Sequence, residues 1–186
     1  MNMVRNLGLV VFFVWLIIDA FAVFRLKTGT AENRDHRSLK LLMMGGPVVF
    51  AICIALSYGA VGSLHSVALQ WAGLAVLLIG IAVRSLAIAQ LGRFHTPNVA
   101  IRGDHQLKEV GLYAYVRHPS YLGAMIGFFG FALTLSNWLG VIVMVSLTTC
   151  LYLYRIKEEE AALAEAFGDA FHQYAVRTKR LVPWVY

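Results

Sequence analysis

Three short segments in the second half of the chain carry the side chains best suited to chemistry. Residues 98–115 form a polar stretch that includes a histidine, a lysine and two tyrosines. Residues 117–121 read Arg-His-Pro-Ser-Tyr, and Arg155 precedes the run Glu158-Glu159-Glu160. An imidazole, phenols, a guanidinium and carboxylates at one place could bind a ligand that is both zwitterionic and aromatic.

Each segment also has a purely structural explanation. Pro119 suits the first turn of a helix, where its missing N–H costs nothing, and a run of glutamates is commonly a solvated helix face. The six histidines show no close metal-ligand spacing, so we predict no metal site. The chain has no GxGxxG, GxxxxGKS, GxSxG or HExxH motif, so these common nucleotide-binding and hydrolytic sites are unsupported. The three segments can form one functional site only if the fold brings them together.

The composition indicates that the positioning elements lie in a membrane. The chain is 59% hydrophobic and 14% charged, whereas soluble domains are typically about 25% charged. A soluble protein of this size could not hide so much apolar surface. The net charge of +6 comes from basic residues that lie between apolar runs. We therefore attribute it to membrane topology and anionic-lipid contacts, and predict no nucleic-acid partner.

Four apolar runs predict five transmembrane helices. Residues 7–24, 41–61 and 67–91 are each near the ~20 residues that a span needs. The last run, 121–154, carries no charge, and as one helix it would be about 51 Å long, well beyond a hydrocarbon core of about 30 Å. The polar pair Ser136-Asn137 lies near its middle. We predict two antiparallel helices that turn at this pair.

Charge bias predicts the orientation. Basic residues concentrate in the connections 25–40 and 92–120 and in the tail after residue 154, whereas 62–66 and Ser136-Asn137 carry no formal charge. Two spans separate each basic segment from the next if the last run is a hairpin, so all three face the cytoplasm. The N-terminus is then outside, and the C-terminus and the chemistry are cytoplasmic.

The segment 157–178 has a different pattern, with apolar residues at helical spacing between charges. It predicts an amphipathic helix on the cytoplasmic surface. The expected fold is an all-α, polytopic membrane helix bundle, with five transmembrane helices, a C-terminal helical hairpin and this amphipathic helix. Residues 1–91 would form three N-terminal spans, and residues 92–186 would form the core that carries the chemistry.

Asp19 and Arg84 are ionisable residues inside two of the apolar runs. Both fall near the cytoplasmic ends of the first and third spans, so we predict that they pair with each other. Intramembrane charges are also the feature that would support a small transporter or a non-catalytic scaffold as the alternative function.

The polar motifs resemble those of the isoprenylcysteine carboxyl methyltransferase family, which is related to the membrane phospholipid methyltransferases. The motifs occur in the family's order and near its spacing over about residues 90–186: Gly103-Asp104-His105-Gln106-Leu107, Gly111-Leu112-Tyr113, Arg117-His118-Pro119-Ser120-Tyr121-Leu122-Gly123, Glu158-Glu159, Phe167-Gly168, Tyr174 and Arg180-Leu181-Val182-Pro183. The short five-span form is similar to prokaryotic members.

The resemblance implies S-adenosylmethionine as methyl donor and no metal. Position by position, it implies donor contacts at Asn98, His105, Gln106, Leu107, Lys108, Tyr113, His118, Pro119, Ser120 and Tyr121, with Glu159 as the acidic partner. It places Arg155 at the methyl-accepting substrate. Lys108 departs from the family, where many members have a small apolar residue. A backbone contact survives that change, and a side-chain contact does not.

The acceptor remains open at this point. A carboxylate acceptor is ionised at pH 7 and needs only an orienting cation, for which Arg155 is suited. An amine acceptor such as phosphatidylethanolamine must lose a proton to a base, which Glu158 or Glu160 could supply. Arg155 favours a carboxylate on a lipophilic, isoprenylcysteine-like molecule that enters from the lipid between helices. A phospholipid N-methyltransferase is the nearest alternative, and a membrane reductase that binds NADPH is a more distant one.

Overall fold

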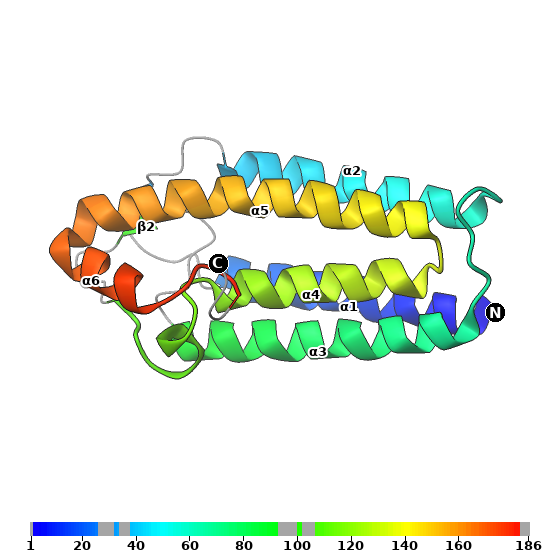
Figure 1. Cartoon of the computed structure of the whole chain (residues 1–186), viewed down its shortest axis with the longest axis horizontal. Coiled ribbons are helices and arrows are strands. Elements are labelled where there is room, and N and C mark those ends of the chain that lie inside the picture. Colours follow the sequence, from blue (N-terminus) through cyan, green and yellow to red (C-terminus); the bar gives the residue numbers. More distant parts are fainter. Residues whose placement is uncertain (1, 26–31, 34–37, 93–99, 102–106, 183–186) are drawn as a thin grey trace.

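The chain folds into a long bundle of helices. The computed structural model describes residues 2–25, 32–33, 38–92, 100–101 and 107–182. Five long helices lie side by side (Figure 1): α1 Asn2–Arg25, α2 Ser38–Tyr58, α3 Val67–Leu91, α4 Pro119–Thr134 and α5 Trp138–Phe167. The remaining elements are short: β1 Glu32–Asn33, β2 Ala100–Ile101, the 3₁₀ helix η2 Gly111–Ala114 and α6 Asp169–Arg177. Strands β1 and β2 form one antiparallel pair.

The predicted all-α membrane class is confirmed. Helices α1, α2, α3 and α5 are long and apolar enough to cross a membrane. Helix α4 has 16 residues and is about 24 Å long at ~1.5 Å per residue, short of a core of about 30 Å. Helix length therefore shows four spans among the described residues, and the fifth span of the prediction is not established by this measure.

A tight turn between α4 and α5 lies at the predicted pair Ser136-Asn137. Ser136 has a positive φ of 52°. The Asn137 side chain caps α5 by accepting the Gly140 N–H at 3.0 Å, and it donates to the carbonyls of Leu56 and Val61, both at 2.9 Å. The buried amide thus joins the hairpin to the end of α2. This is the end of the bundle opposite α6, which we call the hairpin end (Figure 1).

An aromatic cluster fills the centre of the bundle. Phe12 of α1 stacks on Phe131 of α4, with ring centroids 3.7 Å apart. Phe50, Phe128 and Trp15 surround this pair with edge-on or tilted contacts. The outward helix faces remain apolar, as expected for helices that pack inward on each other and outward on lipid. Exposed examples on α1 are Val10, Ile17, Ile18 and Phe21.

The segment after the membrane differs from the single amphipathic helix predicted for residues 157–178. Helix α5 continues without a break to Phe167, and Gly168, with φ of 50°, ends it and begins α6. Glycine adopts this left-handed conformation without a steric penalty, so the chain can reverse there. Helix α6 then buries Phe171 and Tyr174. Because α5 has 30 residues and a core takes about 20, its last third extends beyond the membrane-spanning part.

The two ends of the bundle have different chemistry. At the hairpin end, Tyr58, Trp71 and Trp138 are exposed near the ends of α2, α3 and α5, as aromatic residues are at a membrane–water interface. The opposite end, which we call the α6 end, carries the polar segments with η2 and α6 (Figure 1). The protein is therefore an integral, multi-pass membrane protein with a polar assembly at one end.

Candidate functional site

The first turn of α4 is buried at the α6 end. Pro119 is the first helical residue, and the side chains of His118, Pro119 and Ser120 are all buried. The His118 N–H donates to the Arg180 carbonyl at 3.0 Å, so the entry into α4 is tied to the C-terminal segment. Proline is favoured at this position because its φ suits the helix and its missing N–H has no helical partner.

A chain of hydrogen bonds joins three helices next to this turn. The Tyr121 hydroxyl donates to Glu159 Oε2 at 2.6 Å, and Arg155 Nε donates to the same hydroxyl at 3.3 Å. Arg155 also donates through Nη1 to Ser38 Oγ at 2.7 Å, and the residue is 2% exposed. The hairpin thus brings Tyr121 of α4 to Arg155 and Glu159 of α5, as the sequence predicts.

Ser38 is a site residue that sequence reasoning missed. It is the first residue of α2, is buried, and lies 117 positions from Arg155 in the chain. Serine before an apolar run is common at helix starts, so its type carries no signal of a site. Only the packing of α2 against α5 shows that Ser38 holds the Arg155 guanidinium.

His118 connects the tyrosine to the carboxylates. Its ring stacks on Tyr121, with centroids 5.5 Å apart and planes 5° from parallel. Nε2 lies 3.3 Å from Glu160 Oε1, and Nδ1 lies 3.9 Å from Glu159 Oε2. The imidazole therefore lies between two glutamates, and the stacked rings form a flat aromatic wall beside them.

Glu160 is the most strongly paired carboxylate of the run. Its Oε1 accepts Arg117 Nε at 2.7 Å and its Oε2 accepts Arg180 Nε at 2.8 Å. It lies in the part of α5 beyond a membrane-core length. Burial acts to raise the pKa of Glu160, but hydrogen bonds and charge from His118 and Arg117 outweigh it and lower that pKa to about 2. A carboxylate held ionised in this way is a poor base.

Residues 178–182, which we call the C-terminal strap, hold the loop before α4. The Arg117 N–H donates to the Lys179 carbonyl at 2.7 Å, and the Lys179 N–H donates to the Tyr115 carbonyl at 3.3 Å. The Tyr174 hydroxyl donates to the Tyr113 carbonyl at 2.8 Å. The polar end is therefore one connected assembly of η2, the start of α4, α6 and the strap.

Tyr113 is buried in η2 and faces α3. Its hydroxyl donates to the Ala87 carbonyl at 3.3 Å. Burial, followed by the charge of Glu159, raises the pKa of Tyr113 above its ordinary value. The phenol therefore stays neutral at physiological pH.

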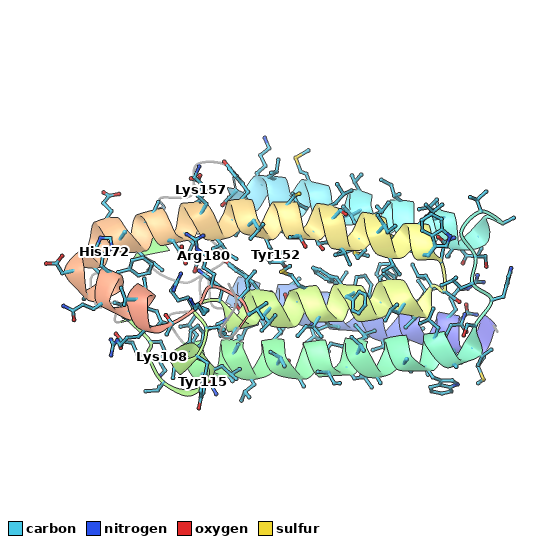
Figure 2. All side chains as sticks on the ribbon, viewed as in Figure 1. Lys108, Tyr115, Tyr152, Lys157, His172 and Arg180 are labelled. Atoms are coloured by element: carbon cyan, nitrogen blue, oxygen red, sulfur yellow. The ribbon has the colours of Figure 1, made fainter. Side chains whose placement is uncertain are left out.

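The other residues of the predicted donor site fall in two groups. Leu107 and Lys108 are partly buried in the segment that leads into η2. Figure 2 shows Lys108, Tyr115 and Arg180 at the α6 end. Tyr152 lies on α5, nearer the middle of the bundle (Figure 2). Asn98, His105 and Gln106 lie outside the described residues. Within the described part of the chain, no three His, Cys, Asp or Glu side chains form a metal-ligand set.

The chain is similar to known proteins in family, in sequence and in structure. The family model described as the isoprenylcysteine carboxyl methyltransferase (ICMT) family matches residues 72–165. The protein-S-isoprenylcysteine O-methyltransferase of Schizosaccharomyces pombe is 35% identical over 118 residues, which is 62% of this chain and 50% of the relative. Methanethiol S-methyltransferase 1 of Bradyrhizobium diazoefficiens is 36% identical over 73 residues, 39% of this chain and 25% of the relative.

The structural likeness extends over more of the chain. A solved structure of the eukaryotic intramembrane Ras methyltransferase ICMT aligns with a TM-score of 0.63 and 25% identity, covering 78% of this chain and 53% of that one. The chain therefore spans about half the length of the Schizosaccharomyces pombe relative and of the solved structure, and a quarter of the Bradyrhizobium diazoefficiens relative. The family match over residues 72–165 includes α4 and most of α5, and with them His118, Tyr121, Arg155 and Glu159.

Proposed function

Because the chain belongs to the isoprenylcysteine carboxyl methyltransferase family, we propose that it is a membrane methyltransferase that uses S-adenosylmethionine to methylate a carboxylate on a lipophilic acceptor. The observation that carries this proposal is the bridge formed by the Tyr121 hydroxyl. It contacts Glu159, the predicted donor-side carboxylate, and Arg155, the predicted acceptor-side cation. Two ligands held by these groups would meet beside one phenol.

The donor side suits a cationic, zwitterionic molecule. S-adenosylmethionine carries an ammonium, a sulfonium and a carboxylate. Glu159 is 29% exposed at its side chain, so it retains room to accept a further hydrogen bond from an ammonium. The stacked rings of His118 and Tyr121 offer π faces to a cation. The start of α4 favours a negative group, as helix N-termini do.

The acceptor side favours a carboxylate over an amine. Arg155 is fully charged at neutral pH, and Ser38 and Tyr121 orient its planar guanidinium. An amine would need a base, and the low pKa of Glu160 makes that residue unsuited to the role. Attack by a carboxylate oxygen on the sulfonium methyl forms a methyl ester and S-adenosylhomocysteine, with no proton to remove. Positioning and exclusion of water are then the main tasks of the site.

An apolar groove between α2 and α5 leads away from Arg155 and fits the hydrocarbon part of such an acceptor. Its volume is about 730 Å³. Nine residues line it: Lys40, Leu41, Met44, Gly45, Val48, Val49, Leu147, Cys150 and Leu151. Leu151 is one helical turn from Arg155, and the Arg155–Ser38 hydrogen bond joins α2 and α5 at the α6 end of the groove. We propose that the acceptor's chain lies here, reached sideways from the lipid.

We also propose that the α6 end faces the cytoplasm. Exposed basic side chains at this end include Lys157, Arg177 and Lys179, whereas the turn Ser136-Asn137 and the connection 59–66 have no formal charge. Cytoplasmic connections carry the excess of Lys and Arg. The N-terminus is then outside, and the donor reaches its site from the cytoplasm.

Calorimetry and methyl transfer test the proposal together. Detergent-purified protein is titrated with S-adenosylhomocysteine and then assayed for transfer of a radiolabelled methyl group to an isoprenylcysteine carboxylate, a phosphatidylethanolamine and a small thiol. We expect binding and transfer to the carboxylate. Glu159→Ala should abolish donor binding, whereas the matched Glu158→Ala should retain it. No binding of wild-type protein at millimolar ligand would contradict the proposal, and transfer only to the amine or the thiol would correct the acceptor.

A further inference from the structure

A partly buried ion pair connects α1 and α3 close to the site. Arg84 Nε lies 2.6 Å from Asp19 Oδ1, and Arg84 Nη2 lies 2.7 Å from Asp19 Oδ2. The side chains are only 11% and 18% exposed. The predicted pairing is present, and it is a bidentate arginine–carboxylate ion pair. Ionisable groups within membrane helices are costly and are commonly kept for a function.

The third nitrogen of Arg84 reaches the start of α4. Arg84 Nη1 donates to the Ser120 carbonyl at 3.2 Å. Helices α3 and α4 are very close at this point: a Cβ added at Gly123 of α4 would lie 2.5 Å from the backbone nitrogen of Arg84 in α3. Ser120 directly precedes Tyr121, whose hydroxyl bridges Glu159 and Arg155. A charged contact on this backbone therefore acts one residue from the centre of the site.

We propose that Asp19 and Arg84 are a positioning pair for methyl transfer. Asp19 holds two nitrogens of the guanidinium and so aims the third at the Ser120 carbonyl. This contact fixes the first turn of α4, and with it the place of the Tyr121 hydroxyl between the donor and acceptor sides. The inference rests on the proposed function, and it gives Asp19 of α1 a role in the site that acts through Arg84.

The chemistry of the pair explains why arginine is needed. A guanidinium can serve a carboxylate with two nitrogens and still present a third donor in a fixed direction. Lysine has one nitrogen, so Arg84→Lys keeps a positive charge opposite Asp19 while losing the directed contact with Ser120. A pair that only anchored α1 to α3 would tolerate this exchange in activity and change only the stability.

Steady-state kinetics and binding of the purified variants test this difference. We expect Arg84→Lys to weaken S-adenosylhomocysteine binding and to lower kcat, each roughly tenfold, as for loss of one hydrogen bond to a charged group. Arg5→Lys is the matched control, because Arg5 contacts the Ser57 carbonyl at the hairpin end. It should leave affinity and kcat unchanged even if the melting temperature falls. If Arg84→Lys is too unstable to purify, Asp19→Asn replaces it with the same expectations.

A second readout separates this inference from the proposed function. Fluorotyrosine incorporated at position 121 reports the surroundings of that ring by ¹⁹F NMR without any ligand. We expect its resonance to shift or broaden in Arg84→Lys and to stay unchanged in Arg5→Lys. Absence of binding by the wild type would overturn the methyltransferase proposal alone. An unchanged ¹⁹F resonance in Arg84→Lys, or unchanged affinity and kcat in an enzyme that is active, would overturn the positioning role.

Discussion

The Tyr121 hydroxyl uses both of its hydrogen-bonding functions within the site. It donates its proton to Glu159 and accepts from Arg155, and its ring contacts the rings of His118 and Tyr152. A phenylalanine would keep both ring contacts and lose both hydrogen bonds. Substitution by phenylalanine therefore isolates the role of the hydroxyl from the role of the ring.

Tyr121→Phe is expected to weaken binding of both the methyl donor and the acceptor. Without the phenol, Glu159 and Arg155 lose their common partner, so donor affinity and acceptor KM should each worsen by roughly tenfold, about the effect of one charge-assisted hydrogen bond. Calorimetry with S-adenosylhomocysteine and transfer kinetics with varied acceptor measure the two effects. Tyr152→Phe, in the neighbouring ring, is the control and should change neither. An effect on only one ligand would show that the hydroxyl does not join the two sides.

Glu160 predicts how stability depends on pH. Its pKa is lowered from the ordinary value of 4.5 to about 2 in the folded protein. The folded state therefore gains stability from this carboxylate above the ordinary pKa and loses it as pH falls from about 5 towards 2. Melting temperatures in detergent between pH 7 and pH 3 should fall for the wild type. Glu160→Gln should melt lower at pH 7 and show a weaker decline, and parallel curves would contradict this assignment.

Among the elements, α3 and α4 approach so closely that their backbones touch. A Cβ added at Gly80 would lie 2.2 Å from the Gly127 nitrogen, and one added at Gly130 would lie 2.2 Å from the Leu77 nitrogen. Small residues at such crossings let membrane helices pack without a gap. The same contact holds Arg84 against the start of α4, so the spacing of these two helices also sets the geometry of the site.

Gly80→Ala is expected to destabilise the bundle. The added methyl group meets backbone, which cannot rotate away, so the helices must separate at a cost of about 1–3 kcal/mol or more. Gly46→Ala is the matched control in α2, where the new Cβ would meet the Phe50 ring at an ordinary 3.8 Å. Melting curves in one detergent compare the two variants. Equal melting temperatures would show that α3 and α4 are not as close as described.

The helical hairpin could be predicted from the sequence because membrane thickness limits helix length. The run 121–154 is too long for one span, and Asn137 marks the turn where the chain reverses. The course of α5 beyond the membrane could not be predicted in the same way. Residues 157–167 suit either a separate surface helix or a continuation of α5, and the positive φ at Gly168 decides where the chain bends.

The candidate site could be predicted only in part for a related reason. Topology places Tyr121, Arg155 and Glu159 at one end of the bundle. It does not determine the direction in which each of the three adjacent glutamate side chains points from α5. Helix rotation directs Glu159 to Tyr121 and Glu160 to Arg117. Ser38 joins the site through packing of α2 on α5. The division into residues 1–91 and 92–186 stays a prediction, and this contact shows that the N-terminal part also holds Arg155.

At the scale of the whole molecule, the proposed site would join two environments. In this proposal the polar assembly of the α6 end meets water, and the apolar groove between α2 and α5 meets lipid along the bundle. Cys150 lines this groove and is exposed, whereas Cys53 is buried. The native thiol at position 150 is therefore a reporter of groove occupancy that requires no new substitution.

An acceptor chain in the groove should protect Cys150 from alkylation. We expect a long-chain isoprenylcysteine to slow the reaction of Cys150 with a membrane-permeant maleimide severalfold, and S-adenosylhomocysteine alone to leave the rate unchanged. Mass spectrometry of the labelled peptide measures the rate. A short-chain cysteine derivative with the same carboxylate is the control. Equal rates with long and short chains would place the hydrocarbon elsewhere on the bundle.

Orientation decides whether the polar end meets the donor inside the cell. Two single-cysteine proteins, built on a background with Cys53→Ala and Cys150→Ala, report the two ends: Leu64→Cys in the connection between α2 and α3, and Val176→Cys in α6, where the valine is 86% exposed. Because basic connections stay in the cytoplasm, a membrane-impermeant maleimide added to intact cells should label Leu64→Cys. It should label Val176→Cys only after permeabilisation. The reverse pattern would put the site outside, where the proposed cytoplasmic donor does not reach it.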